Sequence, residues 1–343
     1  MRKLLNVLYV TSPEAYVSRD GRNVVVRVEQ EEKARVPIHI LESIVCFNYM
    51  GVSPAVMALC AESGVAISFL TESGRFLARV TGPITGNVLL RRQQYRIADD
   101  EQSCHAIVVN LVSAKIANGR TILRRALRDH GNVVDTPRLN RAISELTECL
   151  RLAQASTSLD QLRGIEGRAA HAYFDAFDEL ILEDKPGFSF DGRNRRPPKD
   201  NMNALLSFLY TLLLHDVQSA LESVGLDPYV GFLHRDRPGR PSLALDLMEE
   251  LRPYLADRLA LSLVNRKQVT AKGFRRTENG AVLMSSETRT TVLAAWQKRK
   301  KEMIVHPFLQ ERIEIGLVPY AQALLLARHI RGDLDGFPPF IWR

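Results

Sequence analysis

The residues best suited to chemistry lie close together in residues 231–253. His234 stands in a loop rich in Pro and Gly, and Asp246 and Glu249 follow on a segment with helical periodicity. A spacing of three places both carboxylates on one face of a helix. Like charges at that spacing repel each other, so we expect a cation beside them. An imidazole and carboxylates next to a basic loop form a ligand set for a divalent cation that faces a phosphate.

The ends of this helix can be predicted from two residues. Ser242 is a good N-cap and Pro253 stops the segment, so residues 243–252 are predicted to form a helix of about three turns. His234 lies upstream, where the loop can fold back over the helix. Three arginines make that loop basic: Arg235, Arg237 and Arg240.

Each of these candidates also has an ordinary structural interpretation. His234 is compatible with a loop histidine bonded to a backbone carbonyl, and Asp246 and Glu249 with a solvated helix face. Glu250, four residues after Asp246, competes with Glu249 for the same role. Taken one at a time, the ordinary interpretation is favoured; taken together, the two interpretations are balanced.

A further acid, Glu166, falls in the apolar stripe of its predicted helix. A carboxylate is costly to bury there unless it is paired or binds a metal. Gly164 and Gly167 flank it and allow another backbone or a ligand to approach closely. The ordinary alternative is a salt bridge from Glu166 to Arg163 or Arg168.

The charge of the chain favours a polyanionic partner such as nucleic acid. The 46 basic and 39 acidic residues give a net charge of +7, and the isoelectric point is near 9.3. Many soluble proteins are as basic without such a partner. One loop is especially basic but lacks aromatic residues, so it is either a solvated loop or a clamp on a DNA backbone: Arg193, Arg195, Arg196 and Lys199.

The cysteines and the apolar segments indicate a cytoplasmic protein. The 4 cysteines lie far apart and form no CxxC pair, which predicts reduced, mostly buried thiols. The apolar run at the start is short and broken by Asn6, so it is better explained as a strand than as a signal peptide. No stretch approaches the length of a membrane span, and we expect no membrane association.

The chain is predicted to have an α+β fold in two domains. Residues 1–83 alternate between short β-rich runs and turns and form a small N-terminal β-rich domain. A Gly-Pro cluster ends it, and residues 84–343 are predicted to form a larger all-α domain that carries the site. Residues 88–129 are predicted to form one long helix bearing arginines.

Two further features belong to this organisation. The 83 residues of the β domain are too few to cover both faces of their sheets, so an apolar face or edge is left for a second copy in a homodimer. The tail Gly336-Phe-Pro-Pro-Phe340 is predicted to be extended and docked.

With these pieces in view, the whole chain resembles the CRISPR-associated integrase/endonuclease family, the catalytic first subunit of the spacer-acquisition machinery, and most of all its subtype I-C branch. The specific pieces are Arg163-Gly-Ile-Glu-Gly167 and residues 231–253. Supporting pieces are Leu41–Phe47, Gly64–Leu70, Arg196–Ser207 and Tyr320–Gly332.

The resemblance implies roles for four residues. Glu166, His234 and Glu249 would bind Mg²⁺ or Mn²⁺, which settles the choice between Glu249 and Glu250, and Asp246 would be important for catalysis. The implied activity is insertion of short DNA fragments into the CRISPR array by attack of a 3′-hydroxyl on a phosphodiester. In the nuclease reaction, water takes the place of that hydroxyl.

The resemblance also implies partners. These are prespacer and repeat DNA, a second copy of the chain, and the small second adaptation subunit in a heterohexamer. The candidates for DNA contacts are the basic residues of the two loops: Arg193, Arg195, Arg196, Lys199, Arg235, Arg237 and Arg240. The alternative functions are a non-catalytic DNA-binding scaffold and a metal-dependent hydrolase of small phosphate esters, the latter disfavoured by the basic surface.

Overall fold

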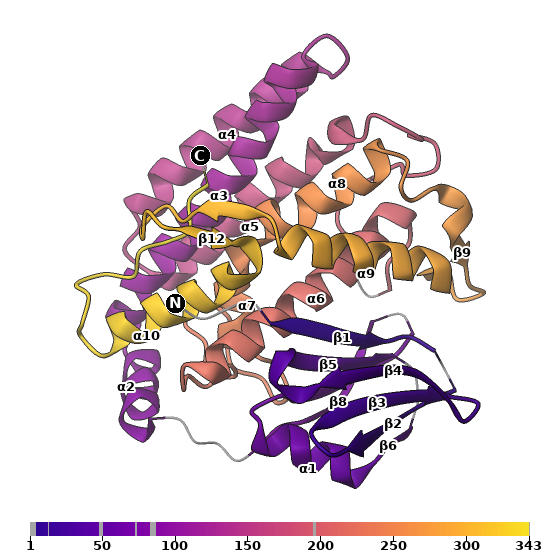
Figure 1. The fold of residues 1–343 in the computed structure, drawn as a ribbon. Coiled ribbons are helices and arrows are strands. Elements are labelled where there is room, and N and C mark those ends of the chain that lie inside the picture. Colours follow the sequence, from indigo (N-terminus) through magenta and orange to yellow (C-terminus); the bar gives the residue numbers. More distant parts are fainter. Residues whose placement is uncertain are drawn as a thin grey trace. The chain divides into compact units, whose positions relative to one another are not determined.

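The computed structural model divides the chain into two compact units. The first contains Met1–Thr85 and Met284–Lys301, and the second contains Gly86–Leu283 and Glu302–Arg343. An N-terminal β-rich part is followed by a helical part, which confirms the predicted α+β fold (Figure 1). The structure describes residues 5–12, 14–47, 51–72, 74–82, 87–194 and 197–342.

The first unit contains two four-stranded sheets. In one, with strand order β1-β5-β7-β8, the first three strands are parallel and β8 is antiparallel to β7. In the other, with order β4-β3-β2-β6, β2 to β4 form an antiparallel meander. The strands are β1 (Asn6–Val10), β2 (Ala15–Asp20), β3 (Asn23–Val28), β4 (Glu31–Pro37), β5 (Leu41–Phe47), β6 (Gly51–Val52), β7 (Ala66–Leu70) and β8 (Phe76–Val80).

One apolar core joins these sheets to helix α1 (Pro54–Glu62). It contains Val17 and Val24 from one sheet, Ile44 from the other and Leu59 from the helix, all at most 1% exposed. The helix begins at Pro54, because the Ser53 hydroxyl accepts a hydrogen bond from the third residue of the helix and a proline occupies its first turn.

Helix α9 (Ser286–Lys300) also belongs to the first unit. The Gln297 amide donates to the Tyr9 hydroxyl at 3.1 Å, and the Arg289 guanidinium lies 5.6 Å from the ring of Phe47 and donates to the backbone carbonyl of Glu72. The sequence alone places these residues in the C-terminal domain and leaves an apolar sheet face open. In the structure, α9 instead packs against the first unit through these contacts with Tyr9, Phe47 and Glu72.

The second unit is built from helices around α3, which packs against α4 and α5. Its helices are α2 (Val88–Asp99), α3 (Glu101–His130), α4 (Thr136–Gln154), α5 (Leu159–Asp175), α6 (Asn201–Ser223), α7 (Ser242–Glu249), α8 (Arg258–Asn265) and α10 (Val318–Ile330).

The single long helix predicted for residues 88–129 is wrong. Asp100 breaks it, since its backbone is extended and its carboxylate caps α3 by accepting the Ser103 N–H at 2.9 Å. Helix α4 was not predicted, although Asp135 caps it in the same way and a proline occupies its first turn. In both places an N-cap signal was present in the sequence.

The helix predicted for residues 243–252 also has different ends. It spans Ser242–Glu249, and the Ser242 hydroxyl donates to the carbonyl of Arg235 instead of capping the helix. Pro253 does not end the helical path, because a π-helical segment, Arg252–Asp257, carries the chain directly into α8. The missing N–H of Pro253 is tolerated in the first turn of that segment.

Small hairpins and a docked tail complete the chain. Strands β9 (Phe274–Arg276) and β10 (Val282–Met284) turn at Gly280, whose φ of +78° favours glycine. Strands β11 (Met303–Val305) and β12 (Arg312–Glu314) form a second hairpin, which was not predicted.

The C-terminal tail is docked, as predicted. Phe337, Phe340 and Trp342 are buried, and the side chain of Asn118 on α3 donates to the Phe340 carbonyl and accepts the Trp342 N–H, both at 2.8 Å. Two guanidinium groups, those of Arg125 and Arg258, each lie 4.2 Å from the Trp342 ring. The tail is therefore part of the core of the second unit.

The predictions about the cysteines and about the apolar segments have different outcomes. All 4 cysteines are free and buried, as predicted. The expectation that no stretch reaches the length of a membrane span is wrong, because α3 and α6 are long and apolar enough. However, 67% and 61% of their most apolar windows are buried in the fold, so the core accounts for their composition.

Candidate active site

Two helices and one loop of the second unit supply the predicted acids and the histidine. Helix α5 supplies Glu166, α7 supplies Asp246 and Glu249, and the loop before α7 supplies His234. Helix α3 adds a residue that was not predicted from the sequence, Lys115.

Lys115 links two of the predicted metal ligands. Its ammonium forms an ion pair and a hydrogen bond with Glu166 and lies 2.7 Å from Oε2 of Glu249. Glu166 therefore pairs with neither Arg163 nor Arg168, which bind Asp160 and Glu145 instead. The sequence did carry a signal for Lys115, because it is a lysine inside the apolar face of α3.

Glu249 is buried between two cations. Its Oε1 lies 2.9 Å from Nη1 of Arg252, and only 4% of its side chain is exposed. Burial alone raises the pKa of Glu249, but Arg252 and Lys115 outweigh it and hold that pKa well below its ordinary value. Burial alone also lowers the pKa of Lys115, and the charges of Glu249 and Glu166 reverse this and raise it. The solvated helix face considered for Glu249 is thus wrong.

The second acid of α7 organises the histidine loop. Asp246 is 0% exposed and accepts the backbone N–H groups of Phe232, Leu233 and His234 at 2.6, 2.9 and 3.0 Å. It also lies 2.6 Å from Nδ1 of His234. Asp246 and Glu249 therefore do not share one cation, although they occupy one short helix. The contact with Asp246 leaves Nε2 of His234 as the nitrogen that can bind a ligand.

Two residues hold this loop in place. Arg163 on α5 donates from two guanidinium nitrogens to the carbonyl of Leu233, both at 3.1 Å. Gly231 is packed so closely that a β-carbon there would lie 2.7 Å from Ser242 Cβ and 2.9 Å from Oδ2 of Asp246. The loop can reach Asp246 only because residue 231 has no side chain.

The donor set is suited to a divalent cation once Lys115 moves. Within the described part of the chain, no three His, Cys, Asp or Glu side chains are arranged as ligands of one metal ion. Yet Oε2 of Glu249 is buried, and the ammonium of Lys115 is its partner in the described contacts. With Glu166 and Nε2 of His234, it offers the oxygen and imidazole ligands that Mg²⁺ and Mn²⁺ accept.

Glu250 has a different role from its neighbour. It is 0% exposed and accepts hydrogen bonds from the Gln322 amide and the Phe340 N–H, both at 2.7 Å. Burial raises its pKa to about 8, against the opposing effect of these two donors. Glu250 holds the C-terminal tail, which agrees with the choice of Glu249 as the site residue.

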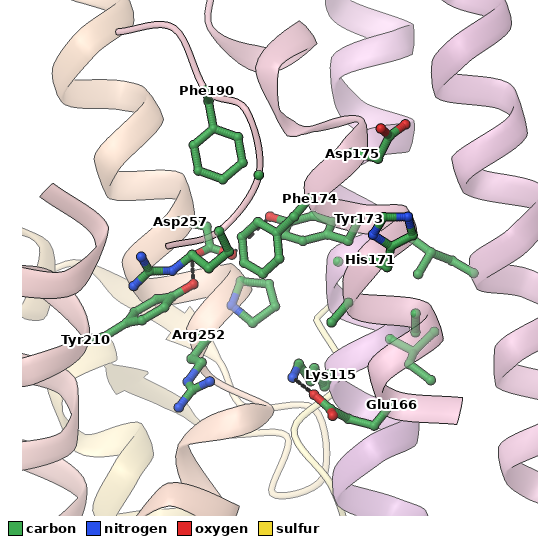
Figure 2. A pocket seen from close by; sticks show the side chains of 18 of the residues that line it. Lys115, Glu166, His171, Tyr173, Phe174, Asp175, Phe190, Tyr210, Arg252 and Asp257 are labelled. Atoms are coloured by element: carbon green, nitrogen blue, oxygen red, sulfur yellow. Dashed lines mark hydrogen bonds and ion pairs between the residues drawn. The ribbon is translucent and has the colours of Figure 1, made fainter. Parts of the chain in front are cut away.

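A cavity of about 590 Å³ opens beside Lys115 and Glu166. Figure 2 shows these two residues at one side of it, with Tyr210 and Asp257 at another. The hydroxyls of Tyr173 and Tyr210 donate to the two oxygens of Asp257 at 3.0 and 2.7 Å. Burial raises the pKa of Asp257 to about 6, although both hydrogen bonds act in the opposite direction.

The candidate DNA-contacting residues fall into three groups. Arg193 is held internally, because it donates to Asn203 at 2.5 Å and to Ser207 at 3.0 Å and lies over Tyr210. Arg195 and Arg196 lie outside the described residues. The remaining four are on the surface of the two loops, Arg240 half-buried and the others exposed: Lys199, Arg235, Arg237 and Arg240.

Comparison with known proteins gives a consistent result. The family model described as "CRISPR associated protein Cas1" matches residues 8–298. The chain is 54% identical, over all of both chains, to "CRISPR-associated endonuclease Cas1 2" of Rhodospirillum rubrum.

Two solved structures share the fold. One is titled "Casposase bound to integration product", with a TM-score of 0.85 and 20% identity over 99% of this chain and 95% of that chain. The other belongs to a "Cas6-RT-Cas1--Cas2 complex", with a TM-score of 0.82 and 24% identity over 100% of this chain and 36% of that chain.

Two glycines near the site should respond to alanine in opposite ways. Gly231→Ala should destabilise the second unit by about 1–3 kcal/mol, because the new methyl group overpacks Ser242 and Asp246. Gly164→Ala should stabilise it by about 0.5–1 kcal/mol, because a β-carbon there meets no atom within 4 Å and α5 gains helix propensity. Thermal unfolding of both variants checks this, and a stable Gly231→Ala protein would contradict the close approach.

Asp257 should make stability fall as the pH rises from about 4 to 6. Its folded pKa is raised to about 6 from an ordinary 3.8, so the folded state keeps a proton that the unfolded chain has lost. Relative to Asp257→Asn, which cannot ionise, the wild-type protein should lose on the order of 3 kcal/mol over that range, because a tenfold difference in proton affinity corresponds to about 1.4 kcal/mol. Unfolding midpoints of the two proteins across the range measure this, and parallel curves would refute it.

Proposed function

The chain belongs to the CRISPR-associated Cas1 family, and from this premise we propose that it is a metal-dependent DNA endonuclease and integrase of the subtype I-C kind. The observation that carries the proposal is the convergence of Glu166 and Glu249 on one cationic group, with His234 held by Asp246, which lies on the same helix as Glu249. Acids buried in this way require a positive charge at that point.

Glu166, Oε2 of Glu249 and Nε2 of His234 are the atoms that would hold Mg²⁺ or Mn²⁺. When bound, the ion polarises a non-bridging phosphate oxygen and stabilises the charge of the transition state. Arg252 keeps Oε1 of Glu249 occupied and so directs Oε2 toward the ion. Asp246 fixes the tautomer and the direction of the imidazole, and its burial keeps it from touching DNA itself.

The substrate is DNA on this proposal. In integration, the 3′-hydroxyl of a prespacer end attacks a phosphodiester of the repeat array, so that a new phosphodiester forms and the 3′-oxygen of the attacked repeat strand leaves. In the nuclease reaction water attacks, and the strand ends as a phosphate and a hydroxyl. The 590 Å³ cavity beside Glu166 lies within the usual size range of ligand pockets and leaves room for one end of a strand. Basic residues of the two loops, with the exposed Lys199, Arg235 and Arg237 foremost, would contact the phosphates.

The assembly we propose contains two copies of this chain and the small adaptation subunit. The fold is shared with a chain of a complex whose title includes Cas2, and we extend that partner to this protein as a heterohexamer of two dimers joined by the small subunit. Two metal sites per dimer would match the two ends of one prespacer. We propose a cytoplasmic location, because the proposed substrate is cellular DNA and the four cysteines are free thiols.

A competing function is a non-catalytic DNA-binding scaffold. Lys115 already neutralises part of the charge of the two acids, as a structure without catalytic metal would require. Assays of strand nicking and half-site joining, run with and without the small subunit, separate the two functions. Activity that depends on Mn²⁺ supports the enzyme and contradicts the scaffold.

Substitution of the site residues should abolish both reactions. Glu166→Ala, His234→Ala and Glu249→Ala should each reduce nicking and joining to the level seen in chelator, because each removes one proposed ligand. Asp246→Asn should lower activity by about 10–100-fold through loss of the fixed imidazole. Gel assays of labelled DNA with Mn²⁺ or chelator measure this.

Glu250 supplies the matched control for that experiment. Glu250→Gln keeps the size of the side chain and one acceptor for the tail, so activity should stay near the wild-type level. Equal loss in Glu250→Gln and Glu249→Gln, or full activity in Glu166→Ala, would show that the wrong acids were chosen.

DNA binding should depend on salt through the exposed loop residues. Changing Lys199, Arg235 and Arg237 to Glu should weaken binding and flatten the plot of log affinity against log salt, by about 0.9 for each phosphate that the protein no longer neutralises. Arg193→Glu should mainly lower stability, because its guanidinium is held internally.

A control for this experiment makes the same charge change elsewhere. Arg128, Arg151 and Lys267 are exposed and lie outside both loops, each paired with a surface acid. Their change to Glu should leave the slope close to the wild-type value. If both triple variants alter the slope equally, the two loops do not bind the DNA.

A further inference from the structure

We propose that Lys115 is an internal counter-ion, whose ammonium holds Glu166 and Glu249 together until a divalent cation displaces it. The proposal rests on the proposed function, since only a metal-dependent enzyme needs to release this group. It assigns Lys115 a positioning role: the lysine keeps the ligands assembled and sets how tightly the metal binds.

The contacts of Lys115 are those of a small cation in the site. It comes from α3, whereas the two acids come from α5 and α7, so its ammonium joins three helices at one point. It pairs with Glu166 and lies 2.7 Å from Oε2 of Glu249. A lysine ammonium is a compact point charge, and in this respect it resembles a metal ion more closely than a planar guanidinium does.

The burial of the site makes a counter-ion necessary. The side chains of Lys115 and Glu249 are only 16% and 4% exposed, and Glu166 is 26% exposed. Two carboxylates brought this close in a poorly hydrated site repel each other and lose hydration. Without Lys115, the only cation that the described contacts give Glu249 is Arg252, on its other oxygen, and Glu166 keeps no described ion pair.

The two oxygens of Glu249 have different cationic partners, so one partner can be exchanged while the other stays bound. Arg252 lies 2.9 Å from Oε1 and Lys115 lies 2.7 Å from Oε2, so the two cations meet different oxygens. The contact at Oε2 can therefore be exchanged while the contact at Oε1 continues to fix the carboxylate.

The displaced ammonium has a place to move. Lys115, Glu166 and Arg252 all line the 590 Å³ cavity, and Figure 2 shows Lys115 pointing into it beside Glu166. The four-carbon stem of a lysine allows its charged end to swing while the backbone of α3 stays fixed. Displacement therefore needs no movement of the three helices.

The affinity of the purified protein for Mn²⁺, measured by electron paramagnetic resonance of free Mn²⁺ and by calorimetry, tests this. Lys115→Met should bind Mn²⁺ about tenfold or more tightly, because the ion no longer competes with the ammonium. In chelator the same variant should unfold several degrees below the wild type, and Mn²⁺ should raise its midpoint by more than it raises that of the wild type. If the substitution only damaged the site, the affinity for Mn²⁺ would fall, which is the opposite of the expected increase.

The matched control is Arg124→Met, which removes one positive charge from an exposed position on the same helix. It should leave both the Mn²⁺ affinity and the midpoint in chelator unchanged. If Lys115→Met does not fold, Lys115→Gln, with an uncharged polar end, gives the same comparison. The double variant Lys115→Met with Glu166→Gln should recover much of the midpoint decrease seen in chelator, because it removes the repulsion that Lys115 offsets.

The outcomes distinguish this proposal from the proposed function. Mn²⁺ binding with the same or lower affinity in Lys115→Met and Lys115→Gln overturns the counter-ion and leaves the metal-dependent function in place. Absence of Mn²⁺ binding in the wild type and in every variant overturns both. Tighter binding together with a lower midpoint in chelator supports the counter-ion.

Discussion

The second unit depends on one constraint: a carboxylate inside a helical core must be given a partner. Five acids meet this constraint in three ways. Glu166 and Glu249 share an ammonium, Asp246 takes backbone N–H groups and an imidazole, and Glu250 and Asp257 have raised pKa values beside neutral donors. Those with charged partners surround the candidate site, whereas the two with raised pKa values bind the tail and the tyrosines that line the cavity.

The acids and the histidine of the candidate site could be singled out from the sequence by their residue types and spacing, and their roles stay a prediction. An acid in an apolar stripe and two acids three residues apart are unusual, and the family resemblance then selected Glu249 over Glu250. Lys115 could not be assigned in the same way, since its partners come from helices 51 and 134 positions away in the chain. A lysine in an apolar face is visible in the sequence, but the group that it neutralises is a property of the packing.

Features of the fold that depend on local sequence were predicted better than features that depend on tertiary packing. The β-rich character predicted for residues 1–83 is confirmed by strands β1 to β8, because the alternation of apolar and polar residues acts over a few positions. Helix α9 could not be assigned to the first unit from its own sequence, because its contacts there are with residues more than about 200 positions earlier in the chain. Arg193 likewise looked like a surface cation until Asn203, Ser207 and Tyr210 were seen to enclose it.

Helix α3 fixes two neighbouring residues of the chain at once. Lys115 contacts Glu249, and Asn118, less than one turn further along, donates to the carbonyl of Glu250 at 2.8 Å and holds the tail. A single residue inserted between these two positions would rotate one contact by about 100° relative to the other. The three-residue spacing between positions 115 and 118 therefore sets how the candidate site is aligned with the docked C-terminal tail.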